Sequence, residues 1–215
     1  IEFITFASTG DATTFGTMSS NITNGQASAS DSTRGLMFGG YAAPLSLNVI
    51  QYITMASSGN GIDFGDLDVT GQSSAFSSPT RAIGVHNGSN RMSYVTISTL
   101  GNAADFGDSL IAAGHRAYAS NAVRGVSFGG ELSPSGAKTN TMEFVTIATL
   151  GGAQDFGDTI AAIQEGSACS SSTRAVYGGG LTPSYQDLMQ YVQIMTTGNS
   201  LDFGDLTQAR GHADA

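Results

Sequence analysis

The feature that most constrains this chain is a four-residue segment, Asp-Phe-Gly-Asp, that returns at regular intervals. Successive copies place their phenylalanines 42 to 50 residues apart. The copies are Asp63–Asp66, Asp105–Asp108, Asp155–Asp158 and Asp202–Asp205, preceded by a degenerate copy at Thr14–Thr17. A period of this length is typical of repeat architectures in which each repeat is one supersecondary unit that packs against the next. The chain is therefore expected to fold as a series of similar units.

A second repeated segment precedes each copy and alternates with period two. It starts with Phe or Tyr and is rich in Ile, Val and Thr, which favours a strand. The segments are 3–6, 52–55, 94–97, 144–147 and 191–194. Gly-Asn, Gly-Gly or Gly-Asp pairs follow them and supply the positive φ of a tight hairpin. The Asp-Phe-Gly-Asp segment is then the return strand, with its phenylalanine in the core; the predicted core aromatics are Phe15, Phe64, Phe106, Phe156 and Phe203.

A third repeated segment begins with arginine. Arg34, Arg81, Arg124 and Arg174 each start a predicted strand, and three of these strands end in an aromatic residue and a Gly-Gly pair. A run of small residues before each arginine predicts one further strand. The order is thus a small-residue strand, an arginine strand, an aromatic strand and an acidic strand. Four short antiparallel strands per repeat match one blade of a β-propeller.

This order resembles the kelch repeat of β-propellers. It is also similar to Gly/Thr-rich, kelch-like tandem repeats in structural or tail-fibre-type proteins of tailed phages, especially aquatic ones. The resemblance covers the whole chain, with two departures. The segment 84–88 lacks the Gly-Gly pair, and phenylalanines stand where the kelch repeat has tryptophan. The resemblance implies an extracellular or virion-associated location and a structural or adhesive role.

Counting the repeats predicts an all-β, single-domain β-propeller over residues 1–215. The repeats are approximately 1–18 (partial), 26–67, 72–109, 115–159, 165–206 and 207–215 (partial). The first lacks its first two strands, and the segment from Arg210 reads as the start of another small-residue strand. We therefore expect five blades of short four-stranded antiparallel sheets, with the closing blade formed from both chain ends and short of one strand.

Composition excludes several classes of function. The net charge of −9, with 8 basic and 17 acidic residues, is opposite to that of proteins that bind nucleic acid or anionic lipid. There is no apolar run of the length of a membrane-spanning helix, so no membrane insertion is expected. The single cysteine excludes a disulfide scaffold and a cysteine-based zinc site. The first residues show no secretion signal.

The repeated charges form the most conspicuous set of polar residues. Arginine can hold a carboxylate through two hydrogen bonds, so we expect the four arginines to pair with the repeated acids as structural clasps. The acids are Asp63, Asp66, Asp105, Asp108, Asp155, Asp158, Asp202 and Asp205. The alternative is a calcium site at a loop end, although the spacing lacks the alternating acids of a calcium loop. The degenerate copy at Thr14–Thr17 has threonines in place of both aspartates, and its repeat has no arginine. The joint loss of both charges favours arginine–aspartate pairing over a calcium site.

No catalytic constellation is visible. His86, His115 and His212 occur singly at different repeat positions, and Cys169 is expected to be a small buried residue. We therefore predict no catalytic, cofactor-binding or metal-binding residues, no cofactor and no enzymatic activity. The loops after the arginine strands vary most. Tyr41 and Tyr185 in them are candidates for a ligand-binding rim, or simply cover the adjacent blade.

The expected function is a non-enzymatic structural or adhesive subunit of an extracellular or virion-associated assembly. Its expected partners are further copies of itself, in a homo-oligomer or filament built by strand exchange or stacking at the incomplete blade, or other structural proteins and surface glycans. The alternative is a monomeric propeller that binds a glycan or a protein through its loop rim.

Overall fold

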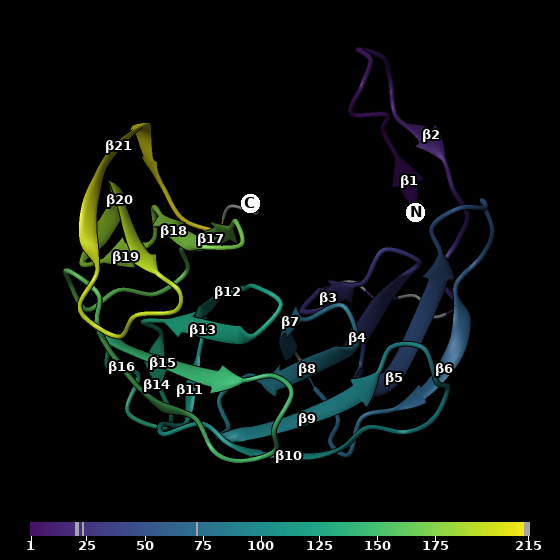
Figure 1. Cartoon of the computed structure of the whole chain (residues 1–215), viewed down its shortest axis with the longest axis horizontal. Coiled ribbons are helices and arrows are strands. Elements are labelled where there is room, and N and C mark those ends of the chain that lie inside the picture. Colours follow the sequence, from purple (N-terminus) through teal and green to yellow (C-terminus); the bar gives the residue numbers. More distant parts are fainter. Residues whose placement is uncertain (20–21, 23, 72, 213–215) are drawn as a thin grey trace.

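The computed structural model describes residues 1–19, 22, 24–71 and 73–212 of the chain. In this part the chain is all-β: short strands are joined by turns. The described residues form no helix long and apolar enough to cross a membrane. Four small antiparallel sheets and one hairpin follow one another along the chain, and Figure 1 shows them arranged around an arc.

Each of the four sheets has its strands side by side in chain order, which confirms the predicted order of small-residue, arginine, aromatic and acidic strands. Sheet I holds β3 (Ala27–Ser30), β4 (Arg34–Ala42), β5 (Leu45–Thr54) and β6 (Ile62–Asp66). Sheet II holds β7 (Ser73–Ser77), β8 (Arg81–His86), β9 (Arg91–Thr96) and β10 (Ala104–Asp108). Sheet III holds β12 (Ala117–Ser120), β13 (Arg124–Phe128), β15 (Thr141–Thr146) and β16 (Gln154–Asp158). Sheet IV holds β17 (Ser167–Ser170), β18 (Arg174–Gly178), β20 (Ser184–Gln193) and β21 (Leu201–Arg210).

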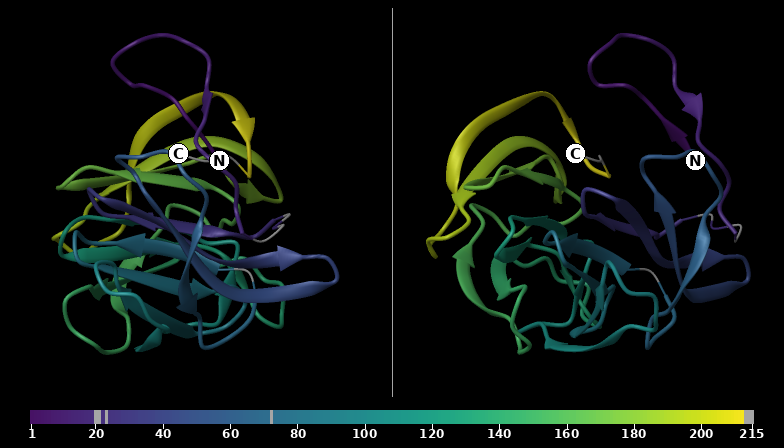
Figure 2. Two further views of the ribbon diagram at one scale, coloured as in Figure 1. Left: turned by 90° about the vertical axis from the view of Figure 1, so that its right-hand side faces the viewer. Right: turned by 45° about the vertical axis from the view of Figure 1, so that its right-hand side comes forward.

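Three short strands complete the sheets. β19 (Leu181–Thr182) folds back on β20, and β11 (Ala113–Gly114) pairs with β14 (Glu131–Leu132) beside sheet III. The first strands of the sheets contact one another in sequence, β3 with β7, β7 with β12 and β12 with β17. They therefore form the hub, and the later strands of each sheet lie farther out (Figures 1 and 2). This arrangement is propeller-like.

The arc is open, so the predicted ring is not closed in the structure. The N-terminal hairpin, made of β1 (Glu2–Phe3) and β2 (Thr13–Thr14), stands at one end, and sheet IV stands at the other (Figure 1). Arg210 ends β21, where it pairs with Gln186. Its carbonyl accepts the Gly180 N–H, as the Ile163 carbonyl accepts the Gly130 N–H ahead of the inner strand of sheet IV. β20 and β21 are ten residues long. After β21 the chain turns back toward the first strand of sheet IV, because the His212 N–H donates to the carbonyl of Glu165 just as the Glu165 N–H donates to that of His115. Residues 213–215 of the predicted closing strand lie outside the described residues, and the five-blade count stays a prediction.

The aromatic residues pack in the same way in every repeat. The ring that starts each aromatic segment meets the phenylalanine of the following acidic segment edge to face, with centroids 6.0–6.1 Å apart. Phe64, Phe106 and Phe156 are at most 3 % exposed and fill the space between neighbouring sheets. Phe15 is half-buried and Phe203 is 48 % exposed, which departs from the expected core position. Both lie at the ends of the arc.

Candidate functional site

The contact that the structure repeats most faithfully joins neighbouring units, and we call it the junction. In a junction, the turn between the aromatic and acidic strands of one unit lies on the acidic strand of the unit before it. The glycine of the turn donates its N–H to the carbonyl oxygen of the repeated phenylalanine, at 2.7–2.9 Å. The pairs are Gly59 on Phe15, Gly101 on Phe64, Gly151 on Phe106 and Gly198 on Phe156. Four junctions therefore link the hairpin and the four sheets.

Two further hydrogen bonds strengthen the junction. The residue two positions after the turn glycine donates its N–H to a second carbonyl of the acidic strand, at 2.8–2.9 Å. In three of the four junctions an asparagine side chain after the glycine accepts a backbone N–H from the same strand at 3.0 Å: Asn60, Asn102 and Asn199 accept from Thr17, Asp66 and Asp158. The turn thus pairs with the acidic strand almost as an additional strand would.

The glycine of the acidic segment makes this approach possible. A Cβ atom on Gly65, Gly107 or Gly157 would lie less than 3.0 Å from the backbone of the docked turn. These glycines also have φ between +130° and +145°, a region that L-residues rarely adopt. Gly204 has the same backbone conformation, with φ of +128°, but a Cβ there would have no neighbour within 4 Å among the described atoms.

The repeated arginines also serve the junction, which corrects the prediction that they pair with the repeated acids. Arg34, Arg81 and Arg124 each donate to a carbonyl oxygen of the next sheet, those of Ile97, Ile147 and Ile194, at 2.8–3.2 Å. All four guanidinium groups lie over the aromatic ring of their own sheet, 4.2–4.8 Å from its centroid. The structure records no ion pair between these arginines and the repeated acids, all of which it describes. The aromatic strand separates them, since it lies between the arginine strand and the acidic strand in each sheet.

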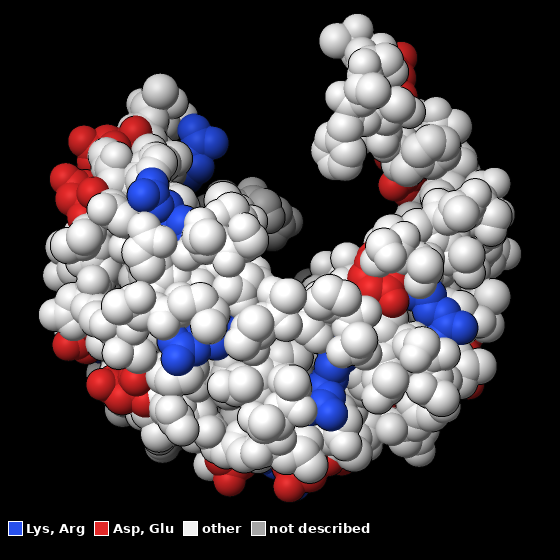
Figure 3. All heavy atoms as spheres, viewed as in Figure 1, with Lys and Arg blue, Asp and Glu red and all other residues white. Residues whose placement is uncertain are grey.

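The repeated acids lie on the acidic strands, away from the hub, and Figure 3 shows acidic patches along the outer edge of the arc. Asp105 and Asp202 accept the N–H of the glycine two residues later, at 3.3 and 3.0 Å. They therefore stabilise the local bend in the acidic strand. Within the described ranges, no group of three or more His, Cys, Asp and Glu side chains is placed to hold a metal ion.

Sequence reasoning missed a buried polar residue on each aromatic strand. Gln51, Ser93, Glu143 and Gln190 are at most 1 % exposed. Three of them accept a backbone N–H from the segment after the preceding acidic strand: Gln51 from Ser19 at 2.7 Å, Glu143 from Leu110 at 2.5 Å and Gln190 from Ile160 at 2.9 Å. A sequence pattern could have identified this position. The residue directly before the first aromatic of the segment is polar in all five repeats, including Glu2 in the first.

In sheet II the corresponding residue is Ser93, whose side chain is shorter than those of Gln51, Glu143 and Gln190. Asp68, from the segment after the acidic strand of sheet I, extends toward it. Asp68 hydrogen-bonds Ser93 and pairs with Arg91, and the Nε2 atom of His86 lies 2.8 Å from the Ser93 hydroxyl. This serine, histidine and aspartate do not form a hydrolytic triad. Ser93 is 1 % exposed and its hydroxyl lies between the other two groups, so the cluster is a structural part of the junction.

We expect this cluster to make folding pH-dependent. Burial lowers the pKa of His86, although Asp68 opposes the change. Burial would raise the pKa of Asp68, but hydrogen bonds from Ser93 and Arg91 outweigh it and hold that pKa below its usual value. Unfolding therefore takes up a proton at His86 once the pH falls below about 6.5, and at Asp68 below about 3.9, so stability declines with acidification.

Urea unfolding at pH 7.5, 6.5 and 5.5 measures the histidine part. The His86→Gln variant should lose less stability than the wild type between pH 7.5 and 5.5, whereas a variant at the exposed His115, His115→Gln, should keep the wild-type dependence. Equal pH dependence of wild type and His86→Gln would contradict this assignment.

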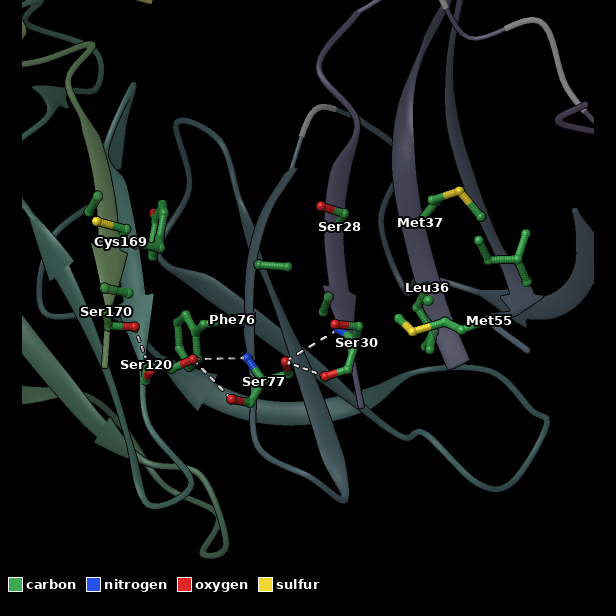
Figure 4. Close-up of a pocket in the computed structure, with 17 residues that line it drawn as sticks. Ser28, Ser30, Leu36, Met37, Met55, Phe76, Ser77, Ser120, Cys169 and Ser170 are labelled. Atoms are coloured by element: carbon green, nitrogen blue, oxygen red, sulfur yellow. Dashed lines mark hydrogen bonds between the residues drawn. The ribbon is translucent and has the colours of Figure 1, made fainter. Parts of the chain in front are cut away.

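A cavity of about 580 Å³ opens at the hub, lined by residues from the first strands of all four sheets (Figure 4). Its serines form a ladder in which each hydroxyl donates to the carbonyl of the serine in the sheet before. Ser77 donates to Ser30, Ser120 to Ser77 and Ser170 to Ser120, at 2.7–2.9 Å. These hydroxyls hold neighbouring sheets together. Cys169 lines the same cavity and is exposed, contrary to the expected buried position.

The two tyrosines proposed for a ligand rim lie at opposite ends of the arc. Tyr41 is half-buried on β4 of sheet I, where its backbone bridges to Asn24. Tyr185 is 50 % exposed on β20 of sheet IV. The structure places them in the first and the last sheet and does not bring them together.

Comparison with known proteins bears on the fold. No family model and no curated protein matches this sequence. The structure is similar to a solved one described as the structure of YjhT, with a TM-score of 0.73 and 12 % sequence identity. The match covers 89 % of this chain and 73 % of that chain. The two share a fold.

Proposed function

We propose that this chain is a non-enzymatic structural subunit, kelch-like and based on five blades, that assembles with further copies of itself in an extracellular or virion-associated structure. The observation that carries the proposal is that the junction is complete inside the arc and incomplete at both ends. The hairpin presents Phe6, which is 98 % exposed, and Ile4, which is 57 % exposed. Sheet IV presents Phe203, which is 48 % exposed although its three counterparts in sheets I to III are buried.

The resemblance to phage structural repeats supports the location and the structural role. The low share of charged residues, 12 %, also supports close packing of identical subunits. A second candidate is a monomeric propeller that binds a glycan or protein through its rim, which the exposed ring of Tyr185 supports.

Electron microscopy and sedimentation velocity of the purified 215-residue chain over a range of concentrations test the proposal. We expect species that grow with protein concentration and regular particles or fibres in the images. Particles that stay monomeric at every concentration would contradict self-assembly and favour the rim-binding alternative, to be followed with a glycan screen.

Assembly should also depend on salt in a defined direction. The chain carries a net charge of −9, so copies that approach one another repel. Raising the ionic strength from about 0.02 M to about 0.3 M shortens the range of this repulsion to less than a third. Sedimentation velocity at the two salt concentrations should show larger species at high salt, and the opposite order would indicate that attraction between opposite charges drives assembly.

A further inference from the structure

We infer that the outer surface of sheet IV is a socket for the N-terminal hairpin of a second copy of this chain, and that this contact repeats the internal junction. The socket consists of Phe203, Gly204 and Asp205 on β21 with Arg174 on β18. The inserted part is the turn of the hairpin around Gly10 and Asp11. This inference rests on the proposed self-assembly and names the surfaces that carry it.

The hairpin has the spacing that a junction needs. In each internal unit the turn glycine follows the first aromatic by seven residues and precedes the repeated phenylalanine by five. Gly10 stands in the same relation to Phe3 and Phe15. The two rings also meet as in the other units, edge to face at 6.1 Å. The hairpin is therefore a fifth copy of the element that docks at every internal junction, with its turn exposed.

The chemistry of the socket matches this turn atom by atom. By analogy with the internal junctions, the Gly10 N–H donates to the carbonyl of Phe203, and the Ala12 N–H donates to the carbonyl of Asp205. The Asp11 carboxylate takes the place of the asparagine side chain and accepts the Asp205 N–H. Each proposed donor faces an acceptor.

Two side chains outside the turn complete the match. Arg174 lies over the ring of Tyr191, 4.5 Å from its centroid, as the other three arginines do over theirs. Those three each donate to a carbonyl of the next unit. In the described part of the chain Arg174 has no recorded carbonyl partner, and the corresponding carbonyl of the hairpin belongs to Phe6. In addition, Glu2 corresponds to the buried polar residue that accepts a backbone N–H across three of the four internal junctions.

No described residue covers Gly204, so the socket is exposed in this structure. The internal counterparts of this glycine are covered so closely by a docked turn that a Cβ would lie within 3.0 Å of its backbone, yet a Cβ on Gly204 would meet no described atom within 4 Å. In the same chain the hairpin faces β21 across the open side of the arc and does not pair with it (Figures 1 and 2). The complete junctions in between keep these ends apart, so a second copy supplies the turn, in a head-to-tail contact.

Two variants remove one side of the contact each. Gly204→Ala has room for its methyl group in the isolated chain but would strike the docked turn. Gly10→Pro removes the N–H that donates to Phe203. In sedimentation velocity each variant alone should require at least about a tenfold higher concentration than the wild type to associate.

The decisive sample is the mixture of the two variants. Gly10→Pro keeps an intact socket and Gly204→Ala keeps an intact hairpin, so together they should form a 1:1 heterodimer and no larger species. Gly151→Ala is the matched control for the socket variant, because Gly151 has φ of +143° and room for a Cβ but lies at an internal junction. Gly10→Ala, which keeps the N–H, is the control for the hairpin variant. Both controls should assemble like the wild type.

The outcomes separate the two proposals. If the wild type assembles and both variants assemble equally well, the socket is wrong and self-assembly uses another surface. If the wild type stays monomeric while its hairpin amides become protected from hydrogen exchange, the hairpin closes onto its own β21, and both the second-copy contact and self-assembly are overturned.

Discussion

Replacing Arg116 with Met is expected to lower the free energy of unfolding by about 3–5 kcal/mol, because it leaves a buried carboxylate without its counter-charge. Arg116 and Glu143 form an ion pair in which both side chains are 1 % exposed. Glu143 also accepts the backbone N–H of Leu110 across a junction, so disturbing it affects two sheets at once. Urea unfolding followed by circular dichroism at neutral pH measures the loss.

The double variant Arg116→Met with Glu143→Gln provides the control. It removes both charges and keeps an amide oxygen that can accept the Leu110 N–H, as Gln51 and Gln190 accept theirs in other sheets. We expect it to recover most of the lost stability. A single variant as stable as the wild type would show that the buried pair contributes nothing to folding.

The second large effect is expected at the junction between sheets II and III. In Gly107→Ala the new methyl group would lie 2.6 Å from the carbonyl of Gly151, and φ of +130° is unfavourable for alanine. We expect a loss of about 2–4 kcal/mol, from overpacking and backbone strain together. Thermal and urea unfolding of the monomer at low concentration measure it.

Gly151→Ala separates the two causes. Gly151 has a similar backbone conformation, but a Cβ there would meet nothing within 4 Å, so only the strain of about 1–2 kcal/mol applies. Equal losses for Gly107→Ala and Gly151→Ala would mean that the tight approach of the turn does not contribute to stability.

The strand order within each repeat could be predicted because it depends on local patterns. The period-two aromatic segments and the glycine pairs behind them specify hairpins wherever they occur. The role of the arginines could not be predicted in the same way, since their partners lie 63 to 70 residues away and are backbone carbonyls, which leave no trace in the sequence. The recurrence of both charges in the same repeats favoured the aspartates as partners of the arginines, but the aromatic strand of each sheet lies between the two.

The ends of the arc show a different limit. Phe203 belongs to the same motif as Phe156 and each meets the first ring of its own aromatic segment edge to face at 6.0 Å, yet Phe203 is 48 % exposed and Phe156 1 %. Phe156 is covered by the turn of the unit that follows it, whereas Phe203 lies in the last sheet. The residues of the motif itself do not indicate whether another unit follows. For the same reason the closing blade was predicted from a count of repeats, and the structure leaves the arc open between the hairpin and β21.

The serine ladder at the hub has a consequence for how such chains can change over time. Every rung is directed from one sheet to the sheet before it, and each rung uses only a hydroxyl and a carbonyl that every repeat supplies. A repeat inserted between two others would find a donor on one side and an acceptor on the other, and its neighbours would keep theirs. Recombination between repeats can therefore alter the copy number of the unit while every remaining contact keeps its chemistry. The limit on growth is the angular room left in the arc.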